Sequence, residues 1–411
     1  MYIKRNIESK LIEASKSYAV ITIYGPRQCG KSTTLLNLFG SKIKFVSLDD
    51  EYERAFANQN PKEFLNVHGY PLVIDEIQKA KPLIGEIKKI VDNYKFQNLK
   101  TGKDNETIYY LTGSSQTELK ETIAESLAGR TAIIDMLPLS LNEKHQKNNY
   151  SFLTKRTDYE KISTSLIKKP NNKIEVFSEI FRGGYPEIYT KNLDRDLFFA
   201  SYIKTYIERD VLKLINSSYE SQFISFLYYL ALRTATQISY EVYAREIGID
   251  VATVKRWLSI LESSNIIKIL EPFYNDPKNR IIKSPKLYFL DTGLCAYLCR
   301  LDSPEGLSNS YLSGNFMETF VVSEIVKKLR SNLINERAHL FYYRDRDQKE
   351  IDIIYFENNT ITPFEIKKND LSPARNKNFK ILQKYDYKIN PGFIIYSGGE
   401  LVTINEEITL L

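Results

Sequence analysis

Cysteine is scarce in this sequence, and long apolar runs are absent. The 411 residues include three cysteines, Cys29, Cys295 and Cys299, which form none of the paired clusters that hold zinc or cross-link a small secreted fold. Nowhere do about 18 apolar residues follow one another, and the N-terminus lacks the apolar stretch of a signal peptide. We therefore expect a cytoplasmic protein without membrane contact.

Neither sign of charge is in large excess. The 57 Lys and Arg residues against 51 Asp and Glu leave a formal net charge of +6, which permits a nucleic-acid partner without requiring one. Hydrophobic residues make up 43% and aromatic residues 12% of the chain, which is enough to bury real cores and excludes disorder as the main state. At roughly 150 residues per domain, the length predicts two to four domains.

The order of segments predicts an α/β domain followed by smaller units. Short β-rich runs alternate with helix-compatible segments over the first 140 residues, as in a parallel sheet covered by helices. The expected units are an α/β domain over 1–150, a helical connector or lid over 151–215, a winged-helix-like region over 216–300 and a small α/β domain over 301–411. The polar stretch 142–173 is expected to be a surface insertion or lid segment.

A phosphate-binding pattern follows the first apolar strand. The segment GPRQCGKS fits G-x-x-x-x-G-K-[ST] and precedes a helical stretch. Its glycines let backbone amides turn inward, Lys31 can reach the outer phosphates, and Ser32 can bind Mg²⁺. The expected nucleotide-binding residues are Gly25, Pro26, Arg27, Gln28, Cys29, Gly30, Lys31, Ser32 and Thr33. Taken alone, such a short match is equally compatible with a Gly-rich turn.

Two further strand ends favour nucleotide binding. The apolar strand PLVI runs into Asp75, expected to support Mg²⁺, and Glu76, expected to polarise the attacking water. The strand IYYL ends in Thr112, Ser114 and Ser115, which can sense the γ-phosphate. The alternative for the acid pair is a helix N-terminus. Three such strand ends in succession favour a nucleotide site.

Several arginines are candidates to complete this site in trans. Arg130 is ranked first as a catalytic residue because it is close in sequence to the third strand, and Arg182 and Arg209 are the others. Each is equally compatible with a structural ion pair.

Residues 239–270 predict a helix, a tight turn at Gly248, a second helix after Asp250 and a strand. The second helix has an apolar face of Val254, Trp257, Leu258 and Leu261. Its other face and the basic loop that follows the strand could contact phosphates, as in a winged helix. The polar face consists of Thr253, Lys255, Arg256 and Ser259. A rigid packing unit with solvated lysines is the alternative.

Near the C-terminus, three strands are predicted, the last two joined at Asn358-Asn359. This turn sets Asp352 opposite Glu365 and Glu350 opposite Lys367 on one face. A divalent metal beside Lys367, with Glu318 from the helix over 315–330, would suit phosphodiester cleavage. An ordinary surface hairpin, with a Glu350–Lys367 ion pair, is the alternative.

With these residues in view, the chain resembles the bacterial and archaeal AAA-type ATPases that carry a C-terminal domain of unknown function numbered 4143. The blocks occur in order along nearly the whole chain: GPRQCGKST, LVIDEIQKA, YLTGSSQ, SLAGR, LPLS, FRGGYPE, TYIERDV, SPKLYFLDTGL, GNFMETFVVSEI, EIDIIYF and PFEIK. The resemblance implies an ATP-binding AAA module, a winged-helix segment and a terminal domain similar to the PD-(D/E)XK nuclease fold. The nuclease signature falls on Glu318, Asp352, Glu365 and Lys367. The insertion 142–173 departs from the family pattern.

We therefore expect an ATP hydrolase of the AAA type, with ATP and Mg²⁺ as cofactors, that couples its nucleotide state to DNA binding or processing. The alternative is a signalling or scaffold ATPase that switches protein–protein contacts and whose nuclease-like domain is a packing unit. DNA, protein partners or further copies of the chain are the expected partners.

Overall fold

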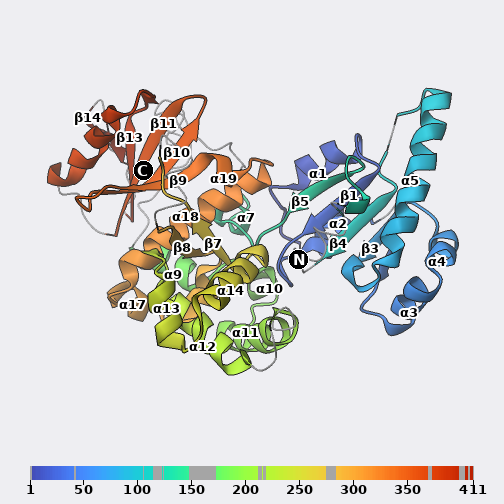
Figure 1. Ribbon diagram of the computed structural model, residues 1–411, viewed down its shortest axis with the longest axis horizontal. Coiled ribbons are helices and arrows are strands. Elements are labelled where there is room, and N and C mark those ends of the chain that lie inside the picture. Colours follow the sequence, from blue (N-terminus) through green and yellow to red (C-terminus); the bar gives the residue numbers. More distant parts are fainter. Residues whose placement is uncertain are drawn as a thin grey trace.

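A computed structural model describes residues 2–40, 43–104, 106–113, 123, 125–147, 173–211, 215, 219–274, 284–368, 373–397, 403–405 and 408–410. Ser114, Ser115, most of the polar insertion, the loop 275–283 and the side chain of Arg209 lie outside this description. Figure 1 shows an N-terminal lobe beside a larger part built from the middle and C-terminal elements. Among the described helices, none is long and apolar enough to cross a membrane.

The N-terminal lobe is built on a five-stranded parallel sheet, as predicted. Its strands are β1 (Val20–Tyr24), β2 (Lys44–Ser47), β3 (Leu72–Asp75), β4 (Tyr109–Gly113) and β5 (Thr131–Asp135). They lie in the order β2-β3-β4-β1-β5, and every pairing is parallel. The carboxyl ends of β1, β3 and β4 therefore meet at one edge, with β4 between the other two.

Helices cover both faces of this sheet. They are α1 (Glu8–Ser15), α2 (Lys31–Phe39), α3 (Glu51–Gln59), α4 (Pro61–His68), the 3-10 turn η1 (Ile77–Lys79) and α5 (Pro82–Thr101). Successive strand residues point to opposite faces, so Ile21 and Ile23 of β1 pack with Leu11 of α1 and Leu35 of α2. The opposite face packs against α4 and α5 in a second cluster. Burial on both faces explains the continuous apolar strands.

The middle of the chain is mostly helical. Its helices are α7 (Leu141–Lys144), α9 (Lys173–Arg182), α10 (Pro186–Thr190), α11 (Arg195–Tyr202), the π-helix η2 (Ile203–Val211), α12 (Glu220–Ala231), α13 (Tyr240–Ile247) and α14 (Val251–Ser263). Gly248 adopts a left-handed φ of 75° between α13 and α14, and Asp250 caps α14 by accepting a hydrogen bond from Thr253 N at 2.8 Å. The predicted apolar face of α14 is buried.

A small antiparallel sheet accompanies these helices, in the order β6-β8-β7. Its strands are β6 (Thr236–Gln237), β7 (Ile267–Leu270) and β8 (Lys286–Phe289). The two helices and the following strand are as predicted, whereas the winged-helix assignment stays a prediction.

The C-terminal part combines helices with a mixed sheet in the order β14-β15-β13-β11-β10-β9. Its elements are α16 (Thr292–Leu298), α17 (Pro304–Asn309), α18 (Ser313–Ser331), α19 (Glu336–His339), β9 (Leu340–Arg344), β10 (Glu350–Glu357), β11 (Thr360–Lys367), the 3-10 segment η5 (Pro373–Lys384), β12 (Lys388–Ile389), β13 (Gly392–Tyr396), β14 (Thr403–Asn405) and β15 (Ile408–Leu410). Ile353 pairs with Phe364, and Asn358 and Asn359 have positive φ. The predicted turn and register of the hairpin are confirmed.

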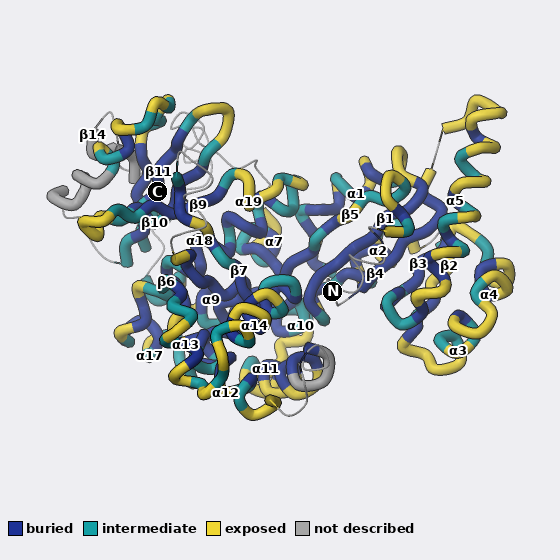
Figure 2. Tube along the Cα trace, in the orientation of Figure 1, coloured by how far each residue is buried: buried dark blue, intermediate teal, exposed yellow. Residues whose placement is uncertain are grey.

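One hydrophobic core joins the middle and C-terminal parts. A single cluster of buried side chains extends from Leu137 through Trp257 of α14 and Phe316 of α18 to Phe393 of β13, and buried segments run through both parts in Figure 2. A backbone hydrogen bond also joins the two parts, since Phe273 N, after β7, donates to Tyr342 O of β9 at 2.6 Å. The cluster of buried side chains extends across position 300, where the sequence predicts a domain boundary, and that boundary stays a prediction.

A buried ion-pair network crosses the same interface. Arg330 of α18 bonds to Glu336 Oε1 at 2.6 Å and to Asn265 Oδ1 at 2.7 Å, and Lys268 Nζ of β7 lies 3.3 Å from the same Glu336 oxygen. Burial disfavours the Glu336 carboxylate, but Arg330 and Lys268 outweigh this effect and lower its pKa to about 2.

We expect Glu336→Gln to lower the free energy of unfolding at pH 7 by about 3 kcal/mol, since a pKa lowered from 4.5 to about 2 corresponds to that amount. A lowered carboxyl pKa stabilises the fold fully above the unfolded pKa, and this stability is lost as pH falls through the folded value. The difference between wild type and variant should thus shrink between about pH 4.5 and pH 2. Urea unfolding across this range measures it, with the exposed Glu305→Gln as control. A difference that stays constant down to pH 2.5 would contradict the assignment.

Candidate functional site

The predicted phosphate-binding loop connects β1 to α2. Gly30 caps α2 with a left-handed φ of 98°, and Gln28 is also left-handed, with φ 59°. A Cβ on Gly25 would lie 2.0 Å from the carbonyl oxygen of Met136, just after β5. A side chain at position 25 would therefore clash with the backbone. The loop thus has the glycine-dependent backbone that a phosphate cradle requires.

Lys31 is buried and folds back on this loop. Its ammonium donates to the carbonyl oxygens of Gly25 at 2.9 Å and Pro26 at 3.0 Å. These bonds hold the charge beside the loop, at the N-terminus of α2, where an anion is favoured.

The Asp75 carboxylate is bonded by hydroxyl groups from three neighbouring elements, α2, β4 and β2. Ser32 Oγ donates to Asp75 Oδ1 at 2.7 Å, and Thr112 Oγ1 of β4 donates to the same oxygen. Ser47 Oγ, at the end of β2, lies 3.4 Å from Asp75 Oδ2. The three predicted strand ends therefore converge, because β4 lies between the strand that enters the loop and the strand that carries the acid pair.

Glu76 follows Asp75 in a left-handed conformation, with φ 58°. Such a conformation is uncommon for a residue other than glycine and is concentrated at functional sites. Its side chain is buried, its Oε2 accepts a hydrogen bond from Gln78 Nε2, and its amide donates to Thr112 Oγ1 at 3.4 Å. Thr112 therefore links both acidic residues.

A cavity of about 390 Å³ adjoins the loop. Its walls come from the N-terminal segment, the start of α2 and α10. They include Tyr2, Ile3, Gln28, Gly30, Thr33, Thr34, Pro186, Glu187, Thr190 and Lys191. Pro186 and Glu187, the last two residues of the FRGGYPE block, thus line the cavity beside the phosphate-binding loop.

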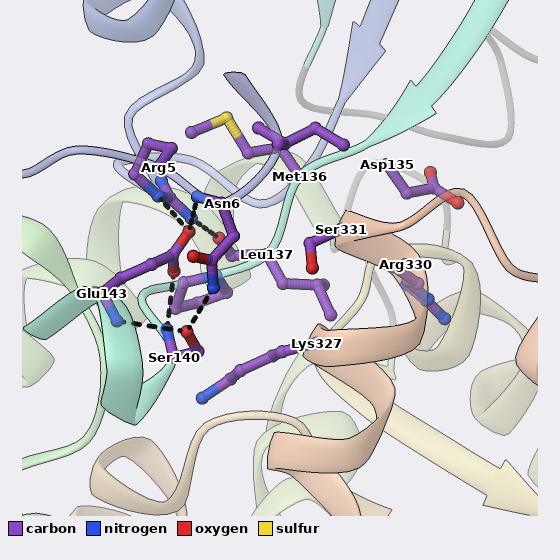
Figure 3. Close-up of a pocket in the computed structure, with 12 residues that line it drawn as sticks. Arg5, Asn6, Asp135, Met136, Leu137, Ser140, Glu143, Lys327, Arg330 and Ser331 are labelled. Carbon is purple, nitrogen blue, oxygen red and sulfur yellow. Dashed lines mark hydrogen bonds and ion pairs between the residues drawn. The ribbon is translucent and has the colours of Figure 1, made fainter. Parts of the chain in front are cut away.

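Arg5 is a buried residue of this region that the sequence did not single out. Its guanidinium donates to Cys29 O in the loop at 2.7 Å, to Leu137 O at 2.6 Å and to Glu143 Oε1 of α7 at 3.1 Å. Figure 3 shows this network on one side of a small pocket, with Lys327 of α18 on another side. Arg5 belongs to no sequence motif, and its neighbour Lys4 is exposed, so nothing in the local sequence predicts that Arg5 is buried. Its role is visible only from the bonds to Cys29, Leu137 and Glu143.

We expect Arg5→Met to lower the free energy of unfolding by about 3–5 kcal/mol, because it leaves Glu143 buried without its ion-pair partner. It should also weaken nucleotide binding, since Cys29 belongs to the loop. Chemical unfolding and titration with a fluorescent ATP analogue measure the two effects. Lys4→Met, a change of the same kind at an exposed neighbouring position, is the control. Equal values for both variants would contradict the role of Arg5.

The structure does not bring Arg130 to its own phosphate-binding loop. Arg130 precedes β5 and pairs with Asp92 of α5 at 2.6 and 3.0 Å. Its carbonyl accepts from Val20 N at the start of β1, whereas the loop follows Tyr24, roughly 13 Å along the strand. Arg130 therefore lies at the amino ends of the parallel strands, whereas the phosphate-binding loop lies at their carboxyl ends, on the opposite side of the sheet. Arg130 thus does not reach the phosphate-binding loop of its own chain, and its role in completing the site in trans stays a prediction.

Arg182 is held by contacts with the neighbouring helix α10. It donates to Ile188 O at 3.1 Å and stacks over the Tyr189 ring at 4.1 Å. The neighbouring Gly183 closely approaches Asp291, which also accepts from Gly184 N at 2.7 Å.

Two of the predicted nuclease-like residues, Glu318 and Asp352, lie close together, and Glu350 joins them. Carboxylate oxygens of Glu318, Glu350 and Asp352 lie within 4.8 Å of one another. Asp352 Oδ2 accepts from the backbone of Ile366, and Lys367 pairs with Glu365 of the same strand. Burial, together with the charges of Glu318 and Glu365, raises the pKa of Asp352 well above its usual range. DNA cleavage at this cluster stays a prediction.

Two residues of β8, missed in the sequence, enter this cluster. Lys286 Nζ lies 2.8 Å from Glu318 Oε1 and also pairs with Glu350, and Tyr288 OH donates to Glu318 Oε1 at 2.6 Å. Burial opposes the charge of Lys286, but the surrounding carboxylates raise its pKa above the ordinary value. A lysine within an otherwise apolar strand was the available signal.

Comparison with known proteins gives three family matches in sequence order. An AAA domain matches residues 17–145, a Domain of unknown function (DUF8612) matches 175–305, and a Domain of unknown function (DUF4143) matches 313–411. The chain is 25% identical over 409 residues to an uncharacterized protein of Mycobacterium tuberculosis, covering 98% of this chain and 82% of that protein. An uncharacterized protein of Methanocaldococcus jannaschii is 26% identical over 420 residues, covering 98% and 86%. The solved Walker-type ATPase PABY2304 of Pyrococcus abyssi gives a TM-score of 0.43 at 14% identity, covering 72% of this chain and 96% of that one.

The N-terminal lobe thus matches an AAA domain, and residues 313–411 match a DUF4143 domain. The predicted order of these two domains is confirmed. The middle match spans both the predicted connector and the predicted winged-helix region.

Proposed function

We propose that this chain binds and hydrolyses ATP with Mg²⁺ and couples its nucleotide state to DNA binding. The observation that carries the first part is the convergence of Ser32, Asp75 and Thr112 beside a glycine-dependent loop. A phosphate-binding loop, a hydroxyl, an acid pair and a polar residue on the intervening strand form the set that ATP hydrolysis needs.

The donor set fits Mg²⁺. A serine hydroxyl and a carboxylate oxygen, 2.7 Å apart, are hard oxygen ligands of the type this ion prefers. Ser32 and Asp75 would hold the ion, directly and through water. Bound Mg²⁺ would neutralise charge on the phosphates during transfer.

The residues of the chain have separate tasks in this proposal. Lys31 would exchange its bonds to the loop carbonyls for bonds to the outer phosphates, and backbone amides at the start of α2 would bind the remaining oxygens. Glu76 would orient and deprotonate the attacking water. Thr112 would hold Asp75 and Glu76 in position through its hydrogen bonds to both residues. The cavity of about 390 Å³ beside the loop is suited in size to the nucleoside.

The coupling to DNA is supported by an exposed basic face of α14. Lys255 and Arg256 are exposed on the helix that follows the tight turn at Gly248, on the side away from Trp257. Exposed basic residues on the second helix of such a pair commonly contact phosphates or base edges.

A signalling or scaffold ATPase is the second candidate. It is favoured by the core that the middle and C-terminal parts share, because a joined body is suited to transmit a nucleotide-dependent movement to a protein-binding surface. In this case nucleotide would change protein contacts and leave DNA unbound.

Phosphate release by the full chain, with Mg²⁺ and with EDTA, tests the ATPase. Gel shifts with single- and double-stranded DNA, with and without ATP, test the coupling, and Lys255→Ala/Arg256→Ala should abolish any shift. Mg²⁺-dependent turnover without binding to any DNA form would favour the scaffold. Absence of both nucleotide binding and turnover would overturn the proposal.

A further inference from the structure

The carboxylate cluster already contains a cation supplied by the chain. Lys286 begins β8, only 4% of its side chain is exposed, and its ammonium pairs with Glu318 of α18 and Glu350 of β10. Tyr288, two residues further on and therefore on the same face of the strand, donates to the same Glu318 oxygen.

The other carboxylates of the cluster also have protein partners. Glu350 Oε2 accepts from Arg344 at 3.1 Å, and Asp352 Oδ2 accepts from Ile366 N at 2.7 Å. Glu365 pairs with Lys367 through Oε1, whereas its buried Oε2 has no hydrogen-bond partner among the described residues. A divalent ion bridging Glu318 and Glu350 would need the position that the Lys286 ammonium holds, and two cations there would repel each other. In this arrangement Glu318 and Glu350 do not fit a divalent metal that bridges them.

The hydrogen bonds around Glu318 indicate what the cluster does. One turn of α18 also bonds to residue 234, which precedes β6: Asn315 Nδ2 donates to Thr234 O at 2.9 Å, and the hydroxyls of Thr319 and Thr234 are 2.7 Å apart. Glu318 lies between these two contacts in the helix. The same turn of α18 is therefore attached to β8 and to the segment that precedes β6.

We propose that Lys286 is the resident cation of this cluster, and that the cluster is a buried latch joining the small sheet to the C-terminal domain. Glu318 and Glu350 clamp the ammonium from α18 and β10, and Tyr288 fixes the position of Glu318. Glu318, one of the residues that match a nuclease signature, then serves together with Glu350 to dock two parts of the chain. This inference concerns the C-terminal half and is independent of the proposed ATPase activity.

Removing the lysine tests the latch. Lys286→Met leaves Glu318 and Glu350 partly buried without the cation between them, so we expect the melting temperature to fall by about 5 °C or more. Lys349→Met, an exposed lysine next to Glu350, should leave it unchanged. Adding Glu318→Gln to Lys286→Met should restore part of the loss, because it removes one uncompensated charge. Equal melting temperatures for Lys286→Met and wild type would overturn the proposal.

Manganese binding tests the same proposal without relying on a destabilised variant. Free Mn²⁺ is measured by electron paramagnetic resonance in the full chain without nucleotide, in an Asp75→Asn background that weakens the other site. We expect Asp352→Asn to change the bound Mn²⁺ by less than about twofold, since metal ligation at a real site is worth far more. A loss of about tenfold or more in affinity on Asp352→Asn would show a metal site and overturn the latch.

Discussion

We expect the Lys31→Ala variant to bind a fluorescent ATP analogue at least about 100-fold more weakly than wild type, a loss of roughly 2.7 kcal/mol. The ammonium is held at the loop by the carbonyls of Gly25 and Pro26, so it is already next to the site where phosphates would bind. A charge-assisted bond to phosphate is among the stronger interactions a single side chain can make. Its removal should therefore affect binding before any chemical step.

The control for this variant is Lys16→Ala, which removes an exposed lysine after α1. It should leave nucleotide affinity unchanged. Because Lys31 also bonds to the loop in the free protein, thermal unfolding should accompany the titration to separate lost binding from lost folding. Undiminished binding by folded Lys31→Ala would remove the phosphate-binding assignment of the loop.

The Glu76→Gln variant should bind ATP as well as wild type while its turnover falls by about 10² to 10⁴-fold, the contribution usual for a general base. Glutamine keeps the size of the side chain and cannot accept a proton from water. The buried, left-handed position of Glu76 after β3 is set by the backbone, so the substitution should not disturb the loop. Single-turnover hydrolysis and equilibrium binding measure the two quantities.

Glu63→Gln, at an exposed position of α4, is the matched control and should turn over normally. Asp75→Asn provides the contrast, because it should raise the Mg²⁺ concentration needed for activity. Normal single-turnover hydrolysis by Glu76→Gln would mean that another group activates the water.

Local patterns were sufficient to predict much of the fold. The helix after Asp250 was predicted because an N-cap and an apolar period of a helix depend on residues within a few positions of each other. The hairpin register followed from Asn358-Asn359, since a two-residue turn with left-handed residues determines which residues face each other. The convergence of Ser32, Asp75 and Thr112 was predicted because parallel strands bring their carboxyl ends to one edge.

The omissions concern residues whose partners are distant in sequence. Closeness in sequence also does not bring Arg130 to the loop of its own chain, because Arg130 precedes its strand, and its role in trans stays a prediction. Arg5 meets Glu143 across 138 positions, and Lys286 meets Glu318 from a different element. No spacing rule connects such pairs.

Neighbouring residues and their backbone preferences were enough to specify the phosphate-binding loop, the acid pair and the hairpin that carries Asp352. The packing of the folded chain specified which cation lies beside each buried carboxylate. An ion pair forms where packing brings two charges within a few ångströms, and that packing is a property of the whole core. Packing thus brings Lys286 of β8 to Glu318, one of the four nuclease-like residues, and to Glu350, whereas Glu365 pairs with Lys367 of its own strand.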